Sequence, residues 1–260
     1  MSRRRFFKRA ARRVLFSDWT RQVLAFVAVF AFFVGTNHFG MSFGSILFEI
    51  TENETVAAFA MSFLMFASFA FGIPVFYGLV GFEISSVSGK NAKLSDLFSA
   101  FSDFDKVIRS YTIFFRLLFK GVLCFLPAIA LLFFKSFFYE NLVQGNWHMF
   151  GIDIVLFCIN TVLVLLVYFG IVMSAGSFVG IYISVKREDK QVDECFYEAK
   201  KCIKGSESEL AKTALSFLPL FAVSLFTMGF LFVLYTVPYM VITLIMFSKY
   251  LYDKKTMCLQ

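Results

Sequence analysis

The chain has 260 residues, of which 59% are hydrophobic and 20% aromatic, and its mean hydropathy is +0.74. These values lie well above those of an ordinary soluble domain and predict an integral membrane protein. The net charge of +7 does not indicate nucleic-acid binding, because most of it lies in the first 21 residues and the other cations flank apolar runs. The cysteine count of five is odd and predicts no disulfide framework.

Residues 1–21 predict a basic amphipathic helix on the cytoplasmic side of a membrane. Within 4–19, apolar side chains recur at helical spacing and form one stripe. This stripe consists of Phe6, Phe7, Ala10, Ala11, Val14 and Leu15. Residues 1–21 carry eight cations, and seven of them form a candidate surface for anionic lipid or a partner: Arg3, Arg4, Arg5, Lys8, Arg9, Arg12 and Arg13. No small-residue cleavage site follows the next apolar run, so we interpret that run as an uncleaved first span.

The chain from 22 to 252 predicts an all-α membrane domain of six spans, each long enough to cross about 30 Å of hydrocarbon as a helix. The predicted spans are 22–46, 56–82, 112–136, 150–184, 210–228 and 230–252. Lysine and arginine gather in alternate connections, which places both chain ends in the cytoplasm, including the tail 253–260. Only Thr227, Met228 and Gly229 separate the last two runs, so a tight outer turn and a re-entrant pair fit equally well.

Two more polar segments predict helices that lie on the inner leaflet, at 94–108 and 192–203. The apolar stripe of the first consists of Leu94, Leu97, Phe98, Phe101, Phe104 and Ile108. The stripe of the second consists of Val192, Cys195, Phe196, Ala199 and Ile203, with Lys200, Lys201 and Lys204 facing away from it. Both segments carry acidic residues in the first turn, which favours helix initiation.

All four prolines lie within predicted spans, where each is expected to kink its helix. They are Pro74, Pro127, Pro219 and Pro238. Gly176 and Gly180 form a G-x-x-x-G motif, for which we expect helix packing inside the monomer, with a homodimer face as the alternative. Arg116 and Lys120 lie one turn apart near the cytoplasmic end of the third span, where long side chains reach the headgroups.

Charged groups are otherwise rare in the spans. Glu83 is placed at the inner boundary of the second span, and Lys135 and Asp153 lie near the outer ends of adjacent spans, where they can pair. We find no carboxylate near the middle of a span, although ion-coupled carriers normally keep one in their pathway.

Several ordered motifs resemble a bacterial family, the domain of unknown function nine hundred seventy-five. The motifs are Gly81, Leu94-Ser95-Asp96-Leu97-Phe98, Leu126-Pro127, Glu198-Ala199-Lys200-Lys201, Ile203-Lys204-Gly205, Leu215-Ser216-Phe217, Met228-Gly229-Phe230, Pro238-Tyr239 and Tyr250. Cys202 and Ile203 depart from the family, which usually has a serine and methionines there. The resemblance implies a multi-pass membrane protein and no catalytic residues.

One motif with catalytic potential stands in the first span. Gly40 to Gly44 match the G-x-S-x-G nucleophile pattern around Ser42, with His38 one turn earlier, and His148 and Asp153 predicted on the same outer side. That pattern acts on a strand-to-helix turn, and no strand is predicted. The two histidines have no metal-site spacing, and a glycine-rich phosphate loop is missing. We therefore expect no enzyme, no metal and no cofactor.

The composition and charge pattern predict a non-catalytic protein of the bacterial plasma membrane. We expect its basic cytoplasmic helices to organise anionic membrane lipids, or to bind a membrane-protein partner or a second copy, and not nucleic acid. A small-solute or lipid transporter is the alternative, because proline-broken helices often build substrate sites. An outward-facing intramembrane hydrolase is the third hypothesis.

Overall fold

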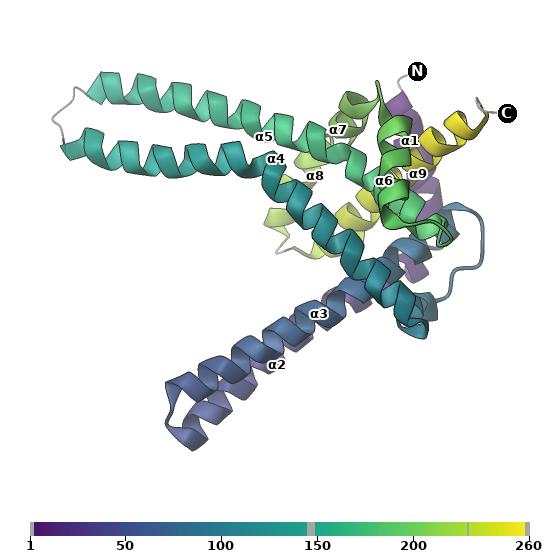
Figure 1. Ribbon diagram of the computed structural model, residues 1–260, viewed down its shortest axis with the longest axis horizontal. Helices are drawn as coiled ribbons and strands as arrows, with labels where there is room; N and C mark the ends of the chain where they lie inside the picture. Colours follow the sequence, from purple (N-terminus) through teal and green to yellow (C-terminus); the bar gives the residue numbers. More distant parts are fainter. Residues whose placement is uncertain (1–2, 145–148, 228, 258–260) are drawn as a thin grey trace.

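The computed structural model describes residues 3–144, 149–227 and 229–257. These residues form helices and turns, with no strand among them, in agreement with the predicted all-α class. Two long helical hairpins, α2–α3 and α4–α5, leave a common region and diverge from each other (Figure 1). The helices are α1 (Arg3–Ser17), α2 (Trp19–Thr51), α3 (Glu54–Val87), α4 (Phe104–Gln144), α5 (Met149–Lys186), α6 (Val192–Ile203), α7 (Glu207–Leu215), α8 (Leu218–Phe226) and α9 (Val237–Met257), with a 3-10 helix η1 (Leu94–Ser102) and a π-helix η2 (Phe232–Thr236).

The turn of the α2–α3 hairpin is built from local polar chemistry. Glu52 ends α2 in the left-handed conformation, with φ of 51°. Asn53 then caps α3, because its side-chain oxygen accepts hydrogen bonds from the backbone N–H groups of Thr55 and Val56 at 3.0 and 3.4 Å. Along the hairpin, Gly40 and Gly44 of α2 are buried against α3.

The two hairpins converge on a packed region that we call the hub, made of α1, α6, α7 and the C-terminal halves of α5 and α9. Its core contains Phe7 of α1, Tyr182 and Ile183 of α5, and Leu244 and Phe247 of α9, all at most 5% exposed. The stripe predicted for 192–203 is buried here, and that of 4–19 packs inward through Phe7, Ala11 and Leu15. These apolar faces therefore contact protein, whereas we predicted contact with the membrane surface.

In the described part of the chain, five helices are long and apolar enough to cross a membrane. They cover Trp19–Thr51, Glu54–Val87, Phe104–Ser136, Leu156–Lys186 and Phe232–Lys255. The predicted fifth span, 210–228, is instead divided between α7 and α8, nine residues each. A nine-residue helix is about 13 Å long and cannot cross about 30 Å of hydrocarbon alone.

The prediction of one helix over 94–108 is wrong in its boundaries. Residues 94–102 form η1, and Asp103 then adopts an extended conformation, with φ of −146° and ψ of 130°. The Asp103 carboxylate accepts a hydrogen bond from the backbone N–H of Asp105 at 3.1 Å, at the start of α4. Phe104 and Ile108 therefore belong to the first turns of the long helix α4.

The four prolines occupy different positions in their helices. Pro74 and Pro127 lie inside the continuous helices α3 and α4, and α4 changes direction along its length (Figure 1). Pro219 stands in the first turn of α8, where its missing N–H costs no hydrogen bond. Pro238 is the second residue of α9, directly after the π-helix η2, a common place for a break in helix geometry. Only two prolines are thus internal to helices.

Candidate functional site: a basic cleft beside the hub

The clearest meeting of charged and apolar surfaces is a cleft between α4, α5, α6 and α7. Its volume is about 470 Å³. Its cations are Arg116 and Lys120 of α4 and Lys200 of α6. The lining also includes Val172, Met173 and Gly176 of α5, Phe196 and Ile203 of α6, and Glu207 at the start of α7. We call this cavity the basic cleft.

Helix α6 closes one side of the cleft because two glycines of α5 allow it to approach. A Cβ atom added at Gly180 would lie 2.6 Å from Cδ1 of Phe196, so any side chain there would displace the ring. A Cβ atom at Gly176 would lie 3.6 Å from Ile203 and 3.9 Å from the Lys120 ammonium. The G-x-x-x-G motif therefore faces α6 of the same chain and the floor of the cleft.

Of the three cations of the cleft, one is paired with a carboxylate of the described residues and two are not. Arg116 forms an ion pair with Asp193, and its guanidinium carbon lies 4.7 Å from the centre of the Phe196 ring. Lys120 and Lys200 form no ion pair with any carboxylate in the described part of the chain. Unpaired positive charge next to an apolar wall is suited to binding an anionic amphiphile, such as a phospholipid.

Arg109 of α4 binds the end of α5 and the loop that leads into α6, a role that the sequence analysis does not predict. Its guanidinium donates hydrogen bonds to the backbone carbonyls of Ser184, Arg187, Glu188 and Lys190, at 2.7 to 3.3 Å. These carbonyls lie at the C-terminal end of α5 and in the following loop, where no backbone N–H of the helix is available to donate a hydrogen bond to them. A cation there also interacts favourably with the helix dipole. The available sequence signal was one arginine among several cations, which does not reveal this contact.

The predicted lipid surface is divided among separate regions. Lys200 lines the basic cleft, whereas Lys201 lines a second cavity of about 270 Å³ with Arg187 and Lys255. There, the hydrogen bond to Glu198 raises the pKa of Lys190. Lys204 is exposed and lines neither cavity. The side chains of Lys200 and Lys201, adjacent in the sequence, thus line two different cavities.

Helix α1 carries all six of its arginines on the outside of the hub. Arg3, Arg4, Arg5, Arg9, Arg12 and Arg13 are exposed. Lys8 instead donates a hydrogen bond to the Ser216 carbonyl at 3.1 Å and lies 4.2 Å from the centre of the Phe217 ring. Burial, with repulsion from Arg4, lowers the pKa of Lys8. Lys8 thus attaches α1 to the junction of α7 and α8.

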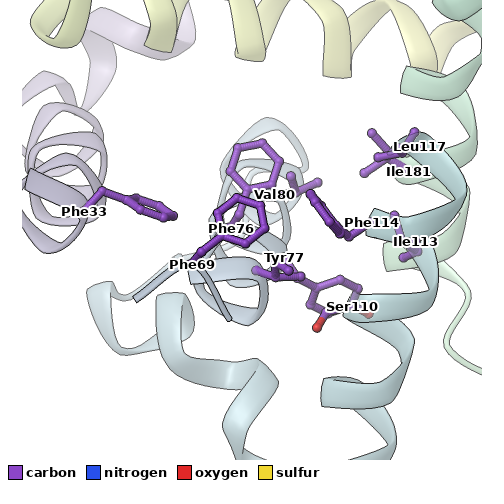
Figure 2. A pocket seen from close by; sticks show the side chains of 11 residues that line it. Phe33, Phe69, Phe76, Tyr77, Val80, Ser110, Ile113, Phe114, Leu117 and Ile181 are labelled. Carbon is purple, nitrogen blue, oxygen red and sulfur yellow. The ribbon is translucent and has the colours of Figure 1, made fainter. Parts of the chain in front are cut away.

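A further cavity, of about 220 Å³, lies between the two hairpins, near the hub. Figure 2 shows Phe33 of α2 on one side, Ile113, Phe114 and Leu117 of α4 on the other, and side chains of α3 between them. Almost all of this lining is apolar, so the cavity suits hydrocarbon better than a hydrated solute.

Glu83, predicted at an inner boundary, is fully buried between α2 and α3. With the Gln22 amide nitrogen turned toward it, the amide donates to both carboxyl oxygens at 3.0 and 2.5 Å, and its oxygen accepts from Ser86 Oγ at 3.0 Å. The described residues provide no cation to pair with Glu83. The contact joins the two helices where they enter the hub.

The motif around Ser42 has no nucleophile elbow, because Gly40 to Gly44 lie within the continuous helix α2. A Cβ atom at Gly44 would lie 3.1 Å from Cβ of Met61, so this glycine serves close packing on α3. His148 lies outside the described residues, and so does the side chain of Asp153. Lys135, predicted as a possible partner of Asp153, donates a hydrogen bond to Asn160 Oδ1 at 2.8 Å.

Comparison with protein-family models, with curated proteins and with solved structures finds no match to the chain.

Proposed function

We propose that this protein is a non-catalytic membrane component that binds the headgroup of an anionic lipid in the basic cleft. The observation that carries the proposal is the meeting of Arg116, Lys120 and Lys200, from two helices 80 residues apart, around one cavity with an apolar wall. A phosphate at the ammonium groups and acyl chains along α4 and α5 would satisfy both halves of the site.

The surroundings of the cleft support a lipid over a soluble anion. Phe119 and Leu123 of α4 and Phe169 of α5 are more than half exposed on the same hairpin. An amphiphile held by its phosphate would cover part of this apolar surface, which a soluble phosphate cannot do. The apolar cavity of Figure 2 also accommodates hydrocarbon and offers little to a polar substrate, so the transporter alternative receives less support.

The proposal includes an orientation, with the hub and both chain ends in the cytoplasm of a bacterium. Cations support this orientation because they occur in α1, in the loop before η1, in α6 and in the tail, which are hub elements or loops beside them. The tip of the α2–α3 hairpin, in contrast, has three glutamates and no cation. The likeness to the family named above supports a multi-pass plasma-membrane protein and adds no activity.

The experiment that tests the proposal compares two double variants purified in mild detergent. Lys120→Gln with Lys200→Gln removes both unpaired ammonium groups, whereas Lys90→Gln with Lys93→Gln removes the same charge from an exposed loop. Each lysine near an anionic headgroup contributes about 1 kcal/mol, so we expect the first variant to bind anionic phospholipid about 30-fold more weakly.

The measurement is native mass spectrometry with titrated phospholipids of matched acyl chains, with thermal unfolding as the folding control. The loop variant should bind as the unaltered protein does. Equal lipid retention by both double variants would refute the proposal.

A further inference from the structure

The basic cleft contains one carboxylate that does not neutralise its cations. Glu207 lines the cavity together with Arg116, Lys120 and Lys200, yet it forms no ion pair with any of them. Its Oε2 atom accepts a hydrogen bond from the backbone N–H of Gly205 at 3.2 Å. The carboxylate is thus held by the turn between α6 and α7, beyond ion-pair distance from the three cations.

A carboxylate in this place has a definite effect on which ligand fits. It accepts hydrogen bonds and repels negative charge, so it disfavours a phosphate placed beside it. A ligand that sets its phosphate at Lys120 and Lys200 and directs a hydroxyl donor toward Glu207 satisfies both sides. Specificity of this kind combines an attractive contact for one ligand with a repulsive one for another.

The charge of the cleft narrows the ligand class further. Arg116 is neutralised by Asp193, and Lys120 and Lys200 together outweigh Glu207 by one positive charge. A matching ligand carries one negative charge and neutral donors. A phosphodiester with a glycerol headgroup has both properties, whereas a phosphate monoester carries more charge and extends no headgroup beyond the phosphate.

We propose that Glu207 is a specificity-determining residue that makes the cleft prefer a singly charged phospholipid with a hydroxyl-bearing headgroup, such as phosphatidylglycerol, over phosphatidic acid. This inference rests on the proposed function, since it assigns the headgroup class of the same cleft.

The test is competition between phosphatidylglycerol and phosphatidic acid of identical acyl chains, read by native mass spectrometry of the full chain. The unaltered protein should favour phosphatidylglycerol by about five-fold, the effect of one net hydrogen bond. Glu207→Gln should bring the two lipids close to parity. The matched control is Glu209→Gln on the same helix, where the carboxylate pairs with Arg3 at 3.6 Å, and it should leave the preference unchanged.

The outcomes separate the two proposals. If the unaltered protein binds both lipids equally, or if Glu207→Gln keeps the full preference, Glu207 does not select the headgroup, even though the lysine double variant loses both lipids. If that double variant retains both lipids, the cleft is not the lipid site and both proposals fail. The comparison of lipids on the unaltered protein stands on its own should Glu207→Gln not fold.

Discussion

Gly78 of α3 lies against the backbone of η1 with no room for a side chain. A Cβ atom there would lie 2.0 Å from the carbonyl oxygen of Leu97 and 2.6 Å from its carbonyl carbon. Backbone atoms cannot rotate away as side chains do, so one added methyl group must displace η1 or α3. The position is one of 15 glycines, and no local pattern distinguishes it in the sequence.

We expect Gly78→Ala to lower the stability of the folded protein by about 1–3 kcal/mol, the usual cost of overpacking. Thermal unfolding in detergent, followed by loss of the monodisperse chromatographic peak, measures the effect. Gly121→Ala on α4 is the control, because no atom lies within 4 Å of its added Cβ. Alanine favours helix over glycine, so that control should be neutral or slightly stabilising. An unchanged midpoint for Gly78→Ala would show that α3 and η1 are less tightly packed.

Among the helices, α6 follows a loop that is bound by Arg109 of α4. Its planar guanidinium bonds several carbonyls at once, which a lysine ammonium cannot reproduce. We expect Arg109→Lys to destabilise the loop 187–191 by about 2 kcal/mol, since hydrogen bonds with a charged partner each contribute about 1.5–3 kcal/mol. Amide hydrogen exchange in residues 187–203 should be faster in the variant than in the unaltered protein.

The control for this prediction is a neighbouring cation with a simpler role. Lys106 forms an ion pair with Glu188 at 3.0 Å, and the Glu188 side chain is nearly half exposed. Such pairs contribute about 0–1 kcal/mol, so Lys106→Gln should leave amide exchange in the loop nearly unchanged. Equal effects of the two variants would mean that the loop is fixed by charge alone and not by the geometry of the guanidinium.

Elements with a strong local pattern could be predicted, and those set by distant contacts could not. The segment 192–203 was predicted with the bounds that α6 has, because five apolar positions at helical spacing all face one way. The segment 94–108 was predicted as one helix, since periodicity does not register the break at Asp103. The run 210–228 is apolar enough for a span, but it divides around Ser216 and Phe217, before Pro219.

The candidate site could be predicted only in parts. Lys200 was included in the predicted lipid surface, while Arg116 and Lys120 were interpreted only as side chains reaching the headgroups. Their meeting requires α6 to lie across α5, which depends on the close approach at Gly180 and on Arg109. These are tertiary contacts between residues about 15 to 80 positions apart. The G-x-x-x-G motif predicted that a helix packs closely on this face of α5, but no local pattern shows that the partner is α6 or that Arg109 bonds the loop before it.

Across the whole molecule, the N-terminal helix α1 packs against the C-terminal helix α9. The Phe7 ring lies 4.9 Å from that of Phe247, and the Tyr239 hydroxyl donates to the Lys8 carbonyl at 3.1 Å. Figure 1 shows α1 and the C-terminal part of α9 on the same side of the molecule. These contacts fit the proposed orientation, in which both ends face the cytoplasm.

This arrangement predicts the result of cysteine labelling in a cysteine-free background. Single cysteines at Lys90, Lys204 and Lys255 should react with an impermeant reagent only after the membrane is opened. A cysteine at Asn53, at the α2–α3 tip, should react in intact cells. Labelling of Lys204 and Lys255 from opposite sides would contradict the proposed orientation.

The divergence of the two hairpins has a consequence for how the protein sits in a bilayer. Outside the hub, α4 and α5 touch chiefly each other, and only 6% of their most apolar stretches is buried. Helix α4 is about 60 Å long by its residue count, roughly twice the hydrocarbon thickness. Such an excess is relieved by tilting or by projection into the headgroups. The tilt of the α4–α5 hairpin therefore depends on the thickness of the host membrane, and a change in lipid chain length changes the angle at which α4 meets the hub.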